Sequence, residues 1–150
     1  MTTMIVAVEP LNAEELRVWH AGKTLGDTVT SRIGADLATV GMSGSEYGIL
    51  SRLDELGDGR LGQQALADSM RWAKSRMSHQ LTRMAARGLV RRDRGPAGVL
   101  VALTPAGRDL LARARPVHAA AVREHLLDRL SEEERTVLVR IAARLAERPD

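Results

Sequence analysis

The sequence contains no cysteine and no phenylalanine, and only 2% of its 150 residues are aromatic. Without cysteine the chain cannot form a disulfide, a thiolate nucleophile or a cysteine-ligated metal centre. The four histidines show neither an adjacent pair nor an HExxH spacing, so we expect no metal site and no other cofactor. No apolar run approaches the roughly 18 residues of a membrane span, and Met1 to Val8 lacks the basic start of a signal peptide. We therefore expect a cytoplasmic protein with no membrane partner.

The excess of positive charge is concentrated in one segment of the chain. Residues 71–94 hold eight basic side chains and one acidic side chain, whereas residues 1–70 hold five basic and ten acidic side chains. The composition, with 44% hydrophobic and 27% charged residues, is typical of one compact domain over residues 1–150. A cluster of like charges is most often an ordinary solvated face. The elements predicted around this cluster favour an anion-binding surface instead.

Helix starts and stops can be read from the sequence, because certain residues supply acceptors for the first N–H groups of a helix. Glycines that tolerate a left-handed closing residue mark the stops at Gly41, Gly57 and Gly88. Three pairs have the capping-box spacing, and one threonine precedes a proline suited to the first helical position. These starts are Asn12 with Glu15, Ser43 with Glu46, Ser131 with Glu134, and Thr104 before Pro105.

Long helices with an apolar stripe are predicted at both ends, within residues 11–41 and 104–148. The first, over about residues 12–40, would be roughly 40 Å long at about 1.5 Å per residue. A core of the central residues cannot cover all of these stripes. We therefore expect a second copy of the chain to cover them in a two-fold symmetric dimer. The alternative is a closed monomeric bundle.

The central residues 42–103 predict a different unit. A short helix, a turn, a second helix and a hairpin form a winged helix-turn-helix. The predicted fold is therefore mainly α, with a two-stranded wing on the central lobe and long dimerisation helices at both ends. The elements of the lobe are helices over 43–56, 63–69 and 73–87, then strands over 89–94 and 99–103 joined by Gly-Pro-Ala-Gly.

The helix over 73–87 has a core side and an outward side. Met77, Leu81 and Met84 fall within one narrow arc at about 100° per residue, so they face the core. The opposite face is polar and positive, and such a face suits the DNA major groove because it can hold phosphates and read base edges. The predicted DNA contacts on this helix are Lys74, Ser75, Arg76, Ser78, His79, Gln80 and Arg83.

Residue types suggest individual roles on this face. Arg76 or Arg83 could bind guanine through two hydrogen bonds, and Gln80 could pair with adenine. The alternative for each is an ordinary solvated side chain. Trp72 could stack on a base, but the turn between the two helices needs an apolar plug, which favours burial.

The wing supplies two further predicted DNA contacts, Arg92 and Arg94. Side-chain alternation places both on one face of the strand and Arg91 with Asp93 on the other. Arg94 lies nearest the tip, so it could reach a minor groove or a phosphate. Arg91 is expected to pair with Asp93 or with solvent.

Several stretches together resemble the MarR (multiple antibiotic resistance regulator) family of dimeric winged-helix transcription factors. The similarity runs from about residue 12 to about residue 147. It implies a homodimer joined by its terminal helices, recognition helices in successive major grooves of a pseudo-palindrome, and wings on the flanks. The stretches are Leu66-Ala67, Trp72 to Met84, Arg87-Gly88-Leu89-Val90-Arg91-Arg92 and Leu103-Thr104-Pro105-Ala106-Gly107-Arg108.

Two features depart from the family pattern. Many relatives carry an Asp-x-Arg pattern in a longer wing, whereas here Asp93 and Arg94 are adjacent and the loop is short. A turn position that is often glycine is Arg71 in this chain, so we expect a locally different turn.

The resemblance also implies a small-molecule site. Many members release DNA when a phenolic or lipophilic molecule binds between the dimer arms and the DNA-binding lobe. Candidate lining residues are Trp19, His20, Tyr47 and His118. The alternative, favoured by residue type, is a core Trp and Tyr with partly exposed histidines.

The leading function is a sequence-specific transcriptional regulator, more a repressor than an activator, that binds double-stranded DNA. The alternative is a winged-helix adaptor for a protein or RNA partner. No nucleophile and base lie at useful spacing, so we expect no catalytic residue and no enzyme activity.

Overall fold

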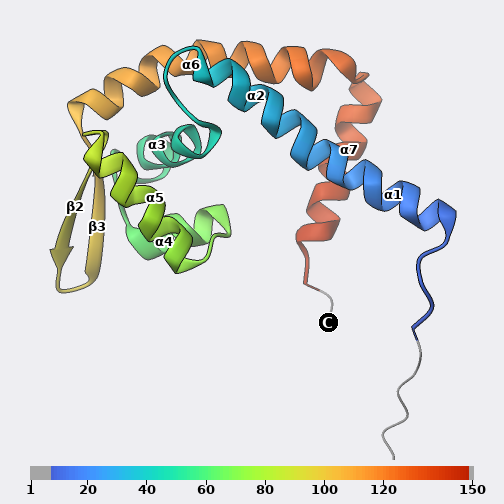
Figure 1. Cartoon of the computed structure of the whole chain (residues 1–150), viewed down its shortest axis with the longest axis horizontal. Coiled ribbons are helices and arrows are strands. Elements are labelled where there is room, and N and C mark those ends of the chain that lie inside the picture. The colour runs from blue at the N-terminus through green and yellow to red at the C-terminus, as the bar shows by residue number, and fades with distance from the viewer. Residues whose placement is uncertain (1–7, 149–150) are drawn as a thin grey trace, which may run out of the picture.

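The computed structural model describes residues 8–148; residues 1–7, most of the segment considered above as a signal peptide, lie outside the described residues. Figure 1 shows a lobe of short helices and a small sheet at one end, and long helices that extend away from it. The predicted mainly helical, winged fold is confirmed. Between residues 8 and 148, no helix combines the length and the apolar character needed to cross a membrane.

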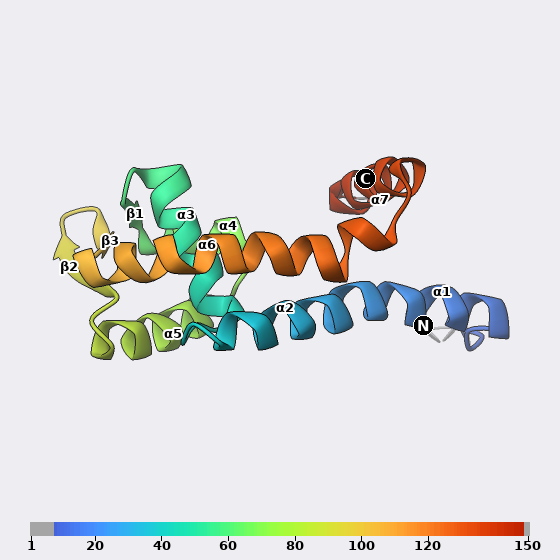
Figure 2. The same cartoon turned by 90° about the horizontal axis from the view of Figure 1, so that it is seen from above.

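Long helical segments form two arms. Figures 1 and 2 show α1 and α2 as one continuous rod, in which the five-residue π-helical segment η1 joins the two helices. In Figure 2 this rod lies beside α6, and α2 packs against α6. The arm segments are α1 (Ala13–Lys23), η1 (Thr24–Thr28), α2 (Val29–Ala38), α6 (Pro105–His125), η2 (Leu127–Arg129) and α7 (Glu132–Ala146).

The lobe contains a three-stranded antiparallel sheet of order β1-β3-β2. The predicted hairpin is present, and its Gly95 pairs with Gly98 so that the turn is short. The additional strand β1 pairs Leu61 with Val101, a long-range pairing that three residues of sequence do not reveal. The lobe elements are α3 (Gly44–Gly57), β1 (Arg60–Gly62), α4 (Gln63–Met70), α5 (Lys74–Ala86), β2 (Val90–Gly95) and β3 (Gly98–Leu103).

All four predicted helix starts are confirmed. Each capping box supplies acceptors for two backbone N–H groups, one at the cap residue and one in the first turn. The caps are Asn12, Ser43 and Ser131, each in a complete box, and Thr104 ahead of Pro105.

Two of the three predicted helix stops use the left-handed conformation. Gly41 and Gly88 have φ of 77° and 73°. Helix α3 ends at Gly57 as predicted, but the left-handed closing position is taken by Asp58, with φ of 52°, and not by the glycine. A Cβ on Gly57 would lie 2.7 Å from Cγ of Leu61, so close packing explains the glycine.

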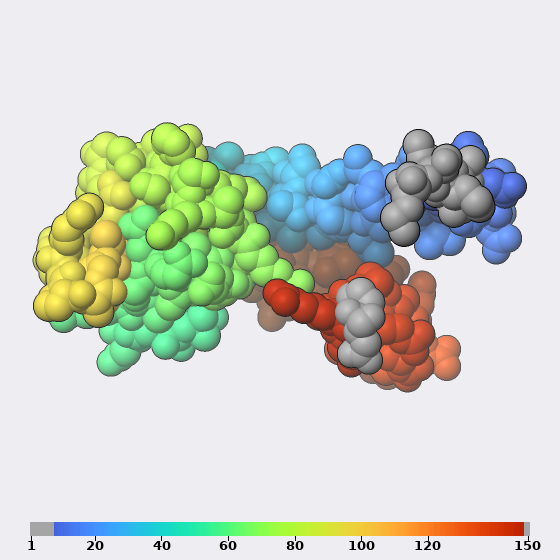
Figure 3. Space-filling view, turned by 90° about the horizontal axis from the view of Figure 1, so that it is seen from below, coloured from blue at the N-terminus to red at the C-terminus, as the bar shows by residue number. Residues whose placement is uncertain are grey.

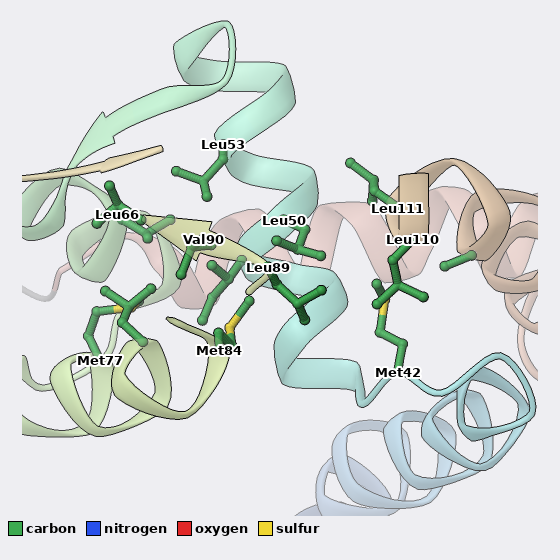
Figure 4. Packing of buried hydrophobic residues seen from close by; sticks show 14 of the residues in the cluster. Met42, Leu50, Leu53, Leu66, Met77, Met84, Leu89, Val90, Leu110 and Leu111 are labelled. Atoms are coloured by element: carbon green, nitrogen blue, oxygen red, sulfur yellow. The ribbon is translucent and has the colours of Figure 1, made fainter. Parts of the chain in front are cut away.

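The hydrophobic core lies in the lobe (Figure 4). Met77, Leu81 and Met84 are fully buried, as predicted. Leu37 of α2 and Leu110 of α6 belong to the same cluster, so the roots of both arms are packed into the lobe. Since burying a leucine side chain contributes about 1.5–3 kcal/mol, this cluster is the main source of stability within one chain.

Beyond their roots the arms are open. Neither α1 nor α7 contributes a buried residue, and Val18 and Leu145 are 70% and 79% exposed. Figure 3 shows a hollow between the blue α1–α2 rod and the red α7. An open groove of about 800 Å³ is lined there by Leu25 together with Val137 and Ile141 of α7. Within residues 8–148 the arms therefore do not close into a monomeric bundle.

Candidate nucleic-acid interface

Helix α5 presents its polar side to solvent. Because its core side is fully buried, the opposite side chains are held outward, and those of Lys74, Ser75, Arg76, His79 and Arg83 are exposed. Ala73, the N-cap, has no side-chain acceptor, so no side chain competes for the first N–H groups of α5. Figure 3 shows the yellow-green α5 next to the yellow wing at one end of the molecule. The structure thus brings these five predicted contacts onto one surface.

Arg76 is held in place by Trp72, in the turn before α5. Its guanidinium lies 3.8 Å from the ring centroid of Trp72. The indole is half-buried and packs against the core cluster, which agrees with the predicted apolar plug. A cation over an aromatic face is attracted by the ring quadrupole, so Trp72 orders Arg76 while leaving it at the surface.

Gln80 does not lie on the exposed face. Its side chain is 9% exposed, and its Oε1 accepts a hydrogen bond from Nη2 of Arg83 at 2.5 Å. Around the helix, position 80 lies about 40° from core-facing Met84 and about 60° from Met77, at about 100° per residue, which explains the burial. The predicted pairing of Gln80 with adenine does not fit this geometry. Ser78 is half-buried at the edge of the face.

The wing is linked to α5 through Arg92. Nη2 of Arg92 donates to Oγ1 of Thr82 at 2.8 Å, so this half-buried arginine bonds within the lobe. Arg94 is exposed near the tip. Nε of Arg91 lies 3.1 Å from Oδ2 of Asp93, which confirms the predicted pairing on the other face.

The turn between α4 and α5 keeps the geometry expected of glycine. Arg71 has a φ of 55°, a left-handed conformation that side chains other than glycine adopt rarely. The expectation of a locally different turn is therefore wrong, because Arg71 itself adopts the unusual backbone conformation.

Two of the four candidate ligand residues come together. The rings of Tyr47 on α3 and His118 on α6 stack with centroids 4.0 Å apart and an angle of 15°. Trp19 and His20 are exposed on α1, which Figures 1 and 2 show far from α3. A single chain therefore does not gather all four residues around one cleft.

A cationic group borders the stacked pair. Arg115 bonds to Oδ2 of Asp54 at 2.6 Å and to Oε1 of Glu55 at 3.2 Å, which ties α6 to α3. Burial raises the pKa of Tyr47, and the charge of Arg115 partly opposes this effect. Burial also lowers the pKa of His118, and Arg115 acts in the same direction. Near neutral pH both rings are therefore uncharged.

One grouping of ligand-type atoms escaped the sequence analysis. Carboxylate and imidazole atoms of Asp36, Glu124 and His125 all lie within 4.8 Å of one another. Nε2 of His125 lies 2.8 Å from Oδ2 of Asp36, a contact between residues 89 positions apart. Histidine spacing along the sequence cannot reveal such a pair. The absence of a metal site stays a prediction.

Comparisons with known proteins identify the relatives of this fold. No protein-family model matches the sequence, and no curated protein matches it. The transcriptional repressor CouR, solved bound to p-coumaroyl-CoA, is similar at 25% identity over 93% of this chain and 100% of its own, with a TM-score of 0.79.

Two MarR family transcriptional regulators from Streptomyces coelicolor are more similar in sequence than CouR. AbsC is 31% identical over 93% of this chain and 96% of its own, with a TM-score of 0.84. Sco3205, solved in complex with DNA, is 32% identical over 95% of this chain and 91% of its own, with a TM-score of 0.85. Since this likeness spans nearly the whole of both chains and includes the lobe and both arms, the chain belongs to the MarR family of transcriptional regulators.

Proposed function

We propose that this protein is a sequence-specific DNA-binding transcriptional regulator that acts as a homodimer on a pseudo-palindromic operator. The observation that carries this function is the exposed polar and cationic face of α5 on a lobe with a well-packed core. Residues 42–103 form the DNA-binding lobe, and residues 11–41 and 104–148 form the dimerisation arms. A compact dimer of this kind acts most simply by occupying a promoter, so it is a repressor and not an enzyme.

In this proposal α5 enters the major groove. Arg76 and Arg83 bind guanine edges, and Ser75 and His79 donate to or accept from neighbouring bases. Lys74 lies in the first turn of α5, where backbone N–H groups also favour a phosphate. The DNA complex of the similar regulator Sco3205 supports this use of the fold.

The wing and the helix edge have smaller roles. Arg94 reaches a phosphate or the minor groove from the exposed tip. Arg92 mainly braces the wing through Thr82, and Ser78 acts at the rim of the contact. Gln80 does not touch DNA, because it is buried beneath Arg83.

The homodimer is proposed from the open arms. A two-fold interface must be complementary to itself, and apolar stripes on α1 and α7 can meet the same stripes of a second copy. The exposed Trp19 of α1 and Ile141 of α7 would then be covered. This cover would also fill the groove beside α7.

Release by a small aromatic molecule is part of the proposal. The stacked rings of Tyr47 and His118 join the lobe to α6, beside the positive Arg115. An aromatic ligand that inserts against this stack would change how α3 meets α6. The similar repressor CouR, bound to p-coumaroyl-CoA, supports an aromatic or acyl effector.

Duplex binding tests the function. Fluorescence anisotropy should show that the protein prefers its own upstream region over a scrambled duplex by at least about a thousandfold at physiological salt. Arg83→Ala should remove much of this preference, whereas Arg113→Ala, an exposed arginine of α6, should preserve it. Equal affinity for both duplexes would instead indicate an adaptor for a protein or RNA partner.

A further inference from the structure

Arg87 joins three elements at the end of the recognition helix. It is the C-cap residue of α5. Its Nη2 donates to the carbonyl oxygen of Gly41 at 2.8 Å, and its Nη1 forms an ion pair with Oε2 of Glu46. Gly41 lies in the turn that follows α2, and Glu46 lies in the first turn of α3. One guanidinium thus links the recognition helix, the arm and the lobe.

The carboxylate that receives Arg87 is fixed in place. Glu46 is 7% exposed, and its Oε1 accepts the N–H of Ser43 at 3.0 Å. In return, the N–H of Glu46 donates to Oγ of Ser43 at 3.1 Å. A buried carboxylate without a cationic partner is costly, so Glu46 holds Arg87 in one position.

The turn that receives Arg87 is also rigid. Leu37 before it and Met42 after it are buried in the core cluster. Gly41 itself has a φ of 77°, and its N–H donates to the carbonyl oxygen of Ala38 at 3.0 Å. From this turn the α1–α2 rod extends roughly 40 Å at about 1.5 Å per residue. A small rotation at the turn therefore produces a large displacement at the far end of the arm.

We propose that Arg87 is a positioning residue for DNA binding, which fixes the angle between the recognition helix and the dimerisation arm through Glu46 and Gly41. This inference rests on the proposed function. In a dimer joined through the arms, that angle determines how far apart the two recognition helices lie and how they face. Arg87 thereby sets the half-site spacing that the dimer accepts, without contacting a base.

Operators of different spacing test this role. One inserted or deleted base pair between the half-sites rotates one of them by about 35°, since a turn has about 10.5 base pairs. Wild-type protein should therefore bind one spacing at least about tenfold better than spacings one base pair longer or shorter. Arg87→Ala and Glu46→Gln should both reduce this discrimination to less than about threefold. Thermal melting and gel filtration check that both variants remain folded dimers.

Two variants of matched chemistry control the experiment. Arg91→Ala also removes an arginine from an ion pair, but both partners of that pair are exposed in the wing, so the spacing preference should persist. Arg87→Lys keeps one charge but cannot hold Gly41 and Glu46 together as Arg87 does. It should give an intermediate preference, and it keeps the test decisive if Arg87→Ala fails to fold.

A distance measurement reads the same role without DNA. Because the sequence has no cysteine, Ala97→Cys in the wing turn can carry a single spin label on each lobe of the dimer. The distance between the two labels should have a narrow distribution in Ala97→Cys and a broad distribution in the double variant that also carries Arg87→Ala. An unchanged distribution would contradict the positioning role.

The outcomes separate the inference from the function. A side chain 46% exposed could instead bind a phosphate. In that case Arg87→Ala would lower the salt slope by about 0.9 and leave the spacing profile unchanged, which would overturn the inference. If wild-type protein shows no preference for any operator, the proposed function itself fails. If wild-type protein is selective and both Arg87→Ala and Glu46→Gln keep its preference for one half-site spacing, only the positioning role of Arg87 fails.

Discussion

The lobe and the arms satisfy their apolar side chains in different ways. The lobe buries its leucines and methionines within one chain, and the ion pair of Arg87 with Glu46 joins its helices α5 and α3. In the arms α2 packs against α6, whereas α1 and α7 bury no residue, and Val139 and Leu145 of α7 are 71% and 79% exposed. The surface proposed to read DNA is therefore complete in one subunit, whereas the surface proposed to pair subunits is not.

The largest effect is expected from a charge in the arm surface. Ile141→Glu should convert the dimer to a monomer, because two carboxylates would have to be buried at the interface. Loss of the second half-site contact should then weaken operator binding by about 100-fold to 10,000-fold. Light scattering and anisotropy measure the two effects.

A leucine of the lobe controls this prediction. Leu56 is 62% exposed on α3, and Ile141 is 48% exposed on α7. Leu56→Glu should therefore leave both association and DNA affinity unchanged. If Leu56→Glu and Ile141→Glu dissociate the protein equally, the contrast between the two regions is wrong.

The next largest effect is expected on stability, from a substitution that leaves a cavity in the core of the lobe. Leu50 is fully buried, so Leu50→Ala should lower the free energy of unfolding by about 2–5 kcal/mol. Leu145→Ala on the open arm should lower it by less than about 0.5 kcal/mol under conditions where the protein is monomeric. Urea titrations followed by circular dichroism compare the variants, and similar losses would show that the arm has its own core.

Truncation of the recognition face should affect DNA binding without affecting stability. Arg76→Ala should cost about 1–3 kcal/mol of cognate binding and little nonspecific binding, because a bidentate contact to guanine is lost. Trp72→Leu keeps the apolar plug but removes the aromatic face beneath Arg76, so its loss should be smaller. Equal losses of Arg76→Ala on cognate and scrambled duplexes would indicate a phosphate contact instead.

The smallest effect concerns the pH dependence of stability. The pKa of His118 is lowered in the folded protein by burial and by Arg115, so the unfolded chain binds a proton more readily. The contribution of neutral His118 to the free energy of unfolding is therefore fully present above the ordinary histidine pKa near 6.5. It declines as the pH falls toward the lower pKa of His118 in the folded protein. Melting temperatures between about pH 7.5 and pH 5 should fall less for His118→Gln than for wild type. His20→Gln, at an exposed position of α1, should follow wild type.

Local sequence patterns predicted most of the helices and strands, but they could not predict contacts between residues far apart in the sequence. The capping boxes and the buried face of α5 depend on residues three or four apart, so their spacing was sufficient. Strand β1 and the contact between Asp36 and His125 join distant segments, which no local pattern encodes. Gln80 could be assigned to the outward face only approximately, because its burial depends on what packs beside the helix. The left-handed backbone of Arg71 could not be predicted, because the type of side chain does not determine the backbone conformation.

The contact of Arg76 with Trp72 gives the protein an intrinsic optical probe. An indole beneath a guanidinium emits differently once the cation leaves, so engagement of Arg76 by guanine would change the fluorescence of Trp72 at the moment of recognition. The other tryptophan, Trp19, lies on the exposed arm and would report on subunit pairing. Replacing either indole with phenylalanine would therefore separate the kinetics of operator capture from those of dimer assembly.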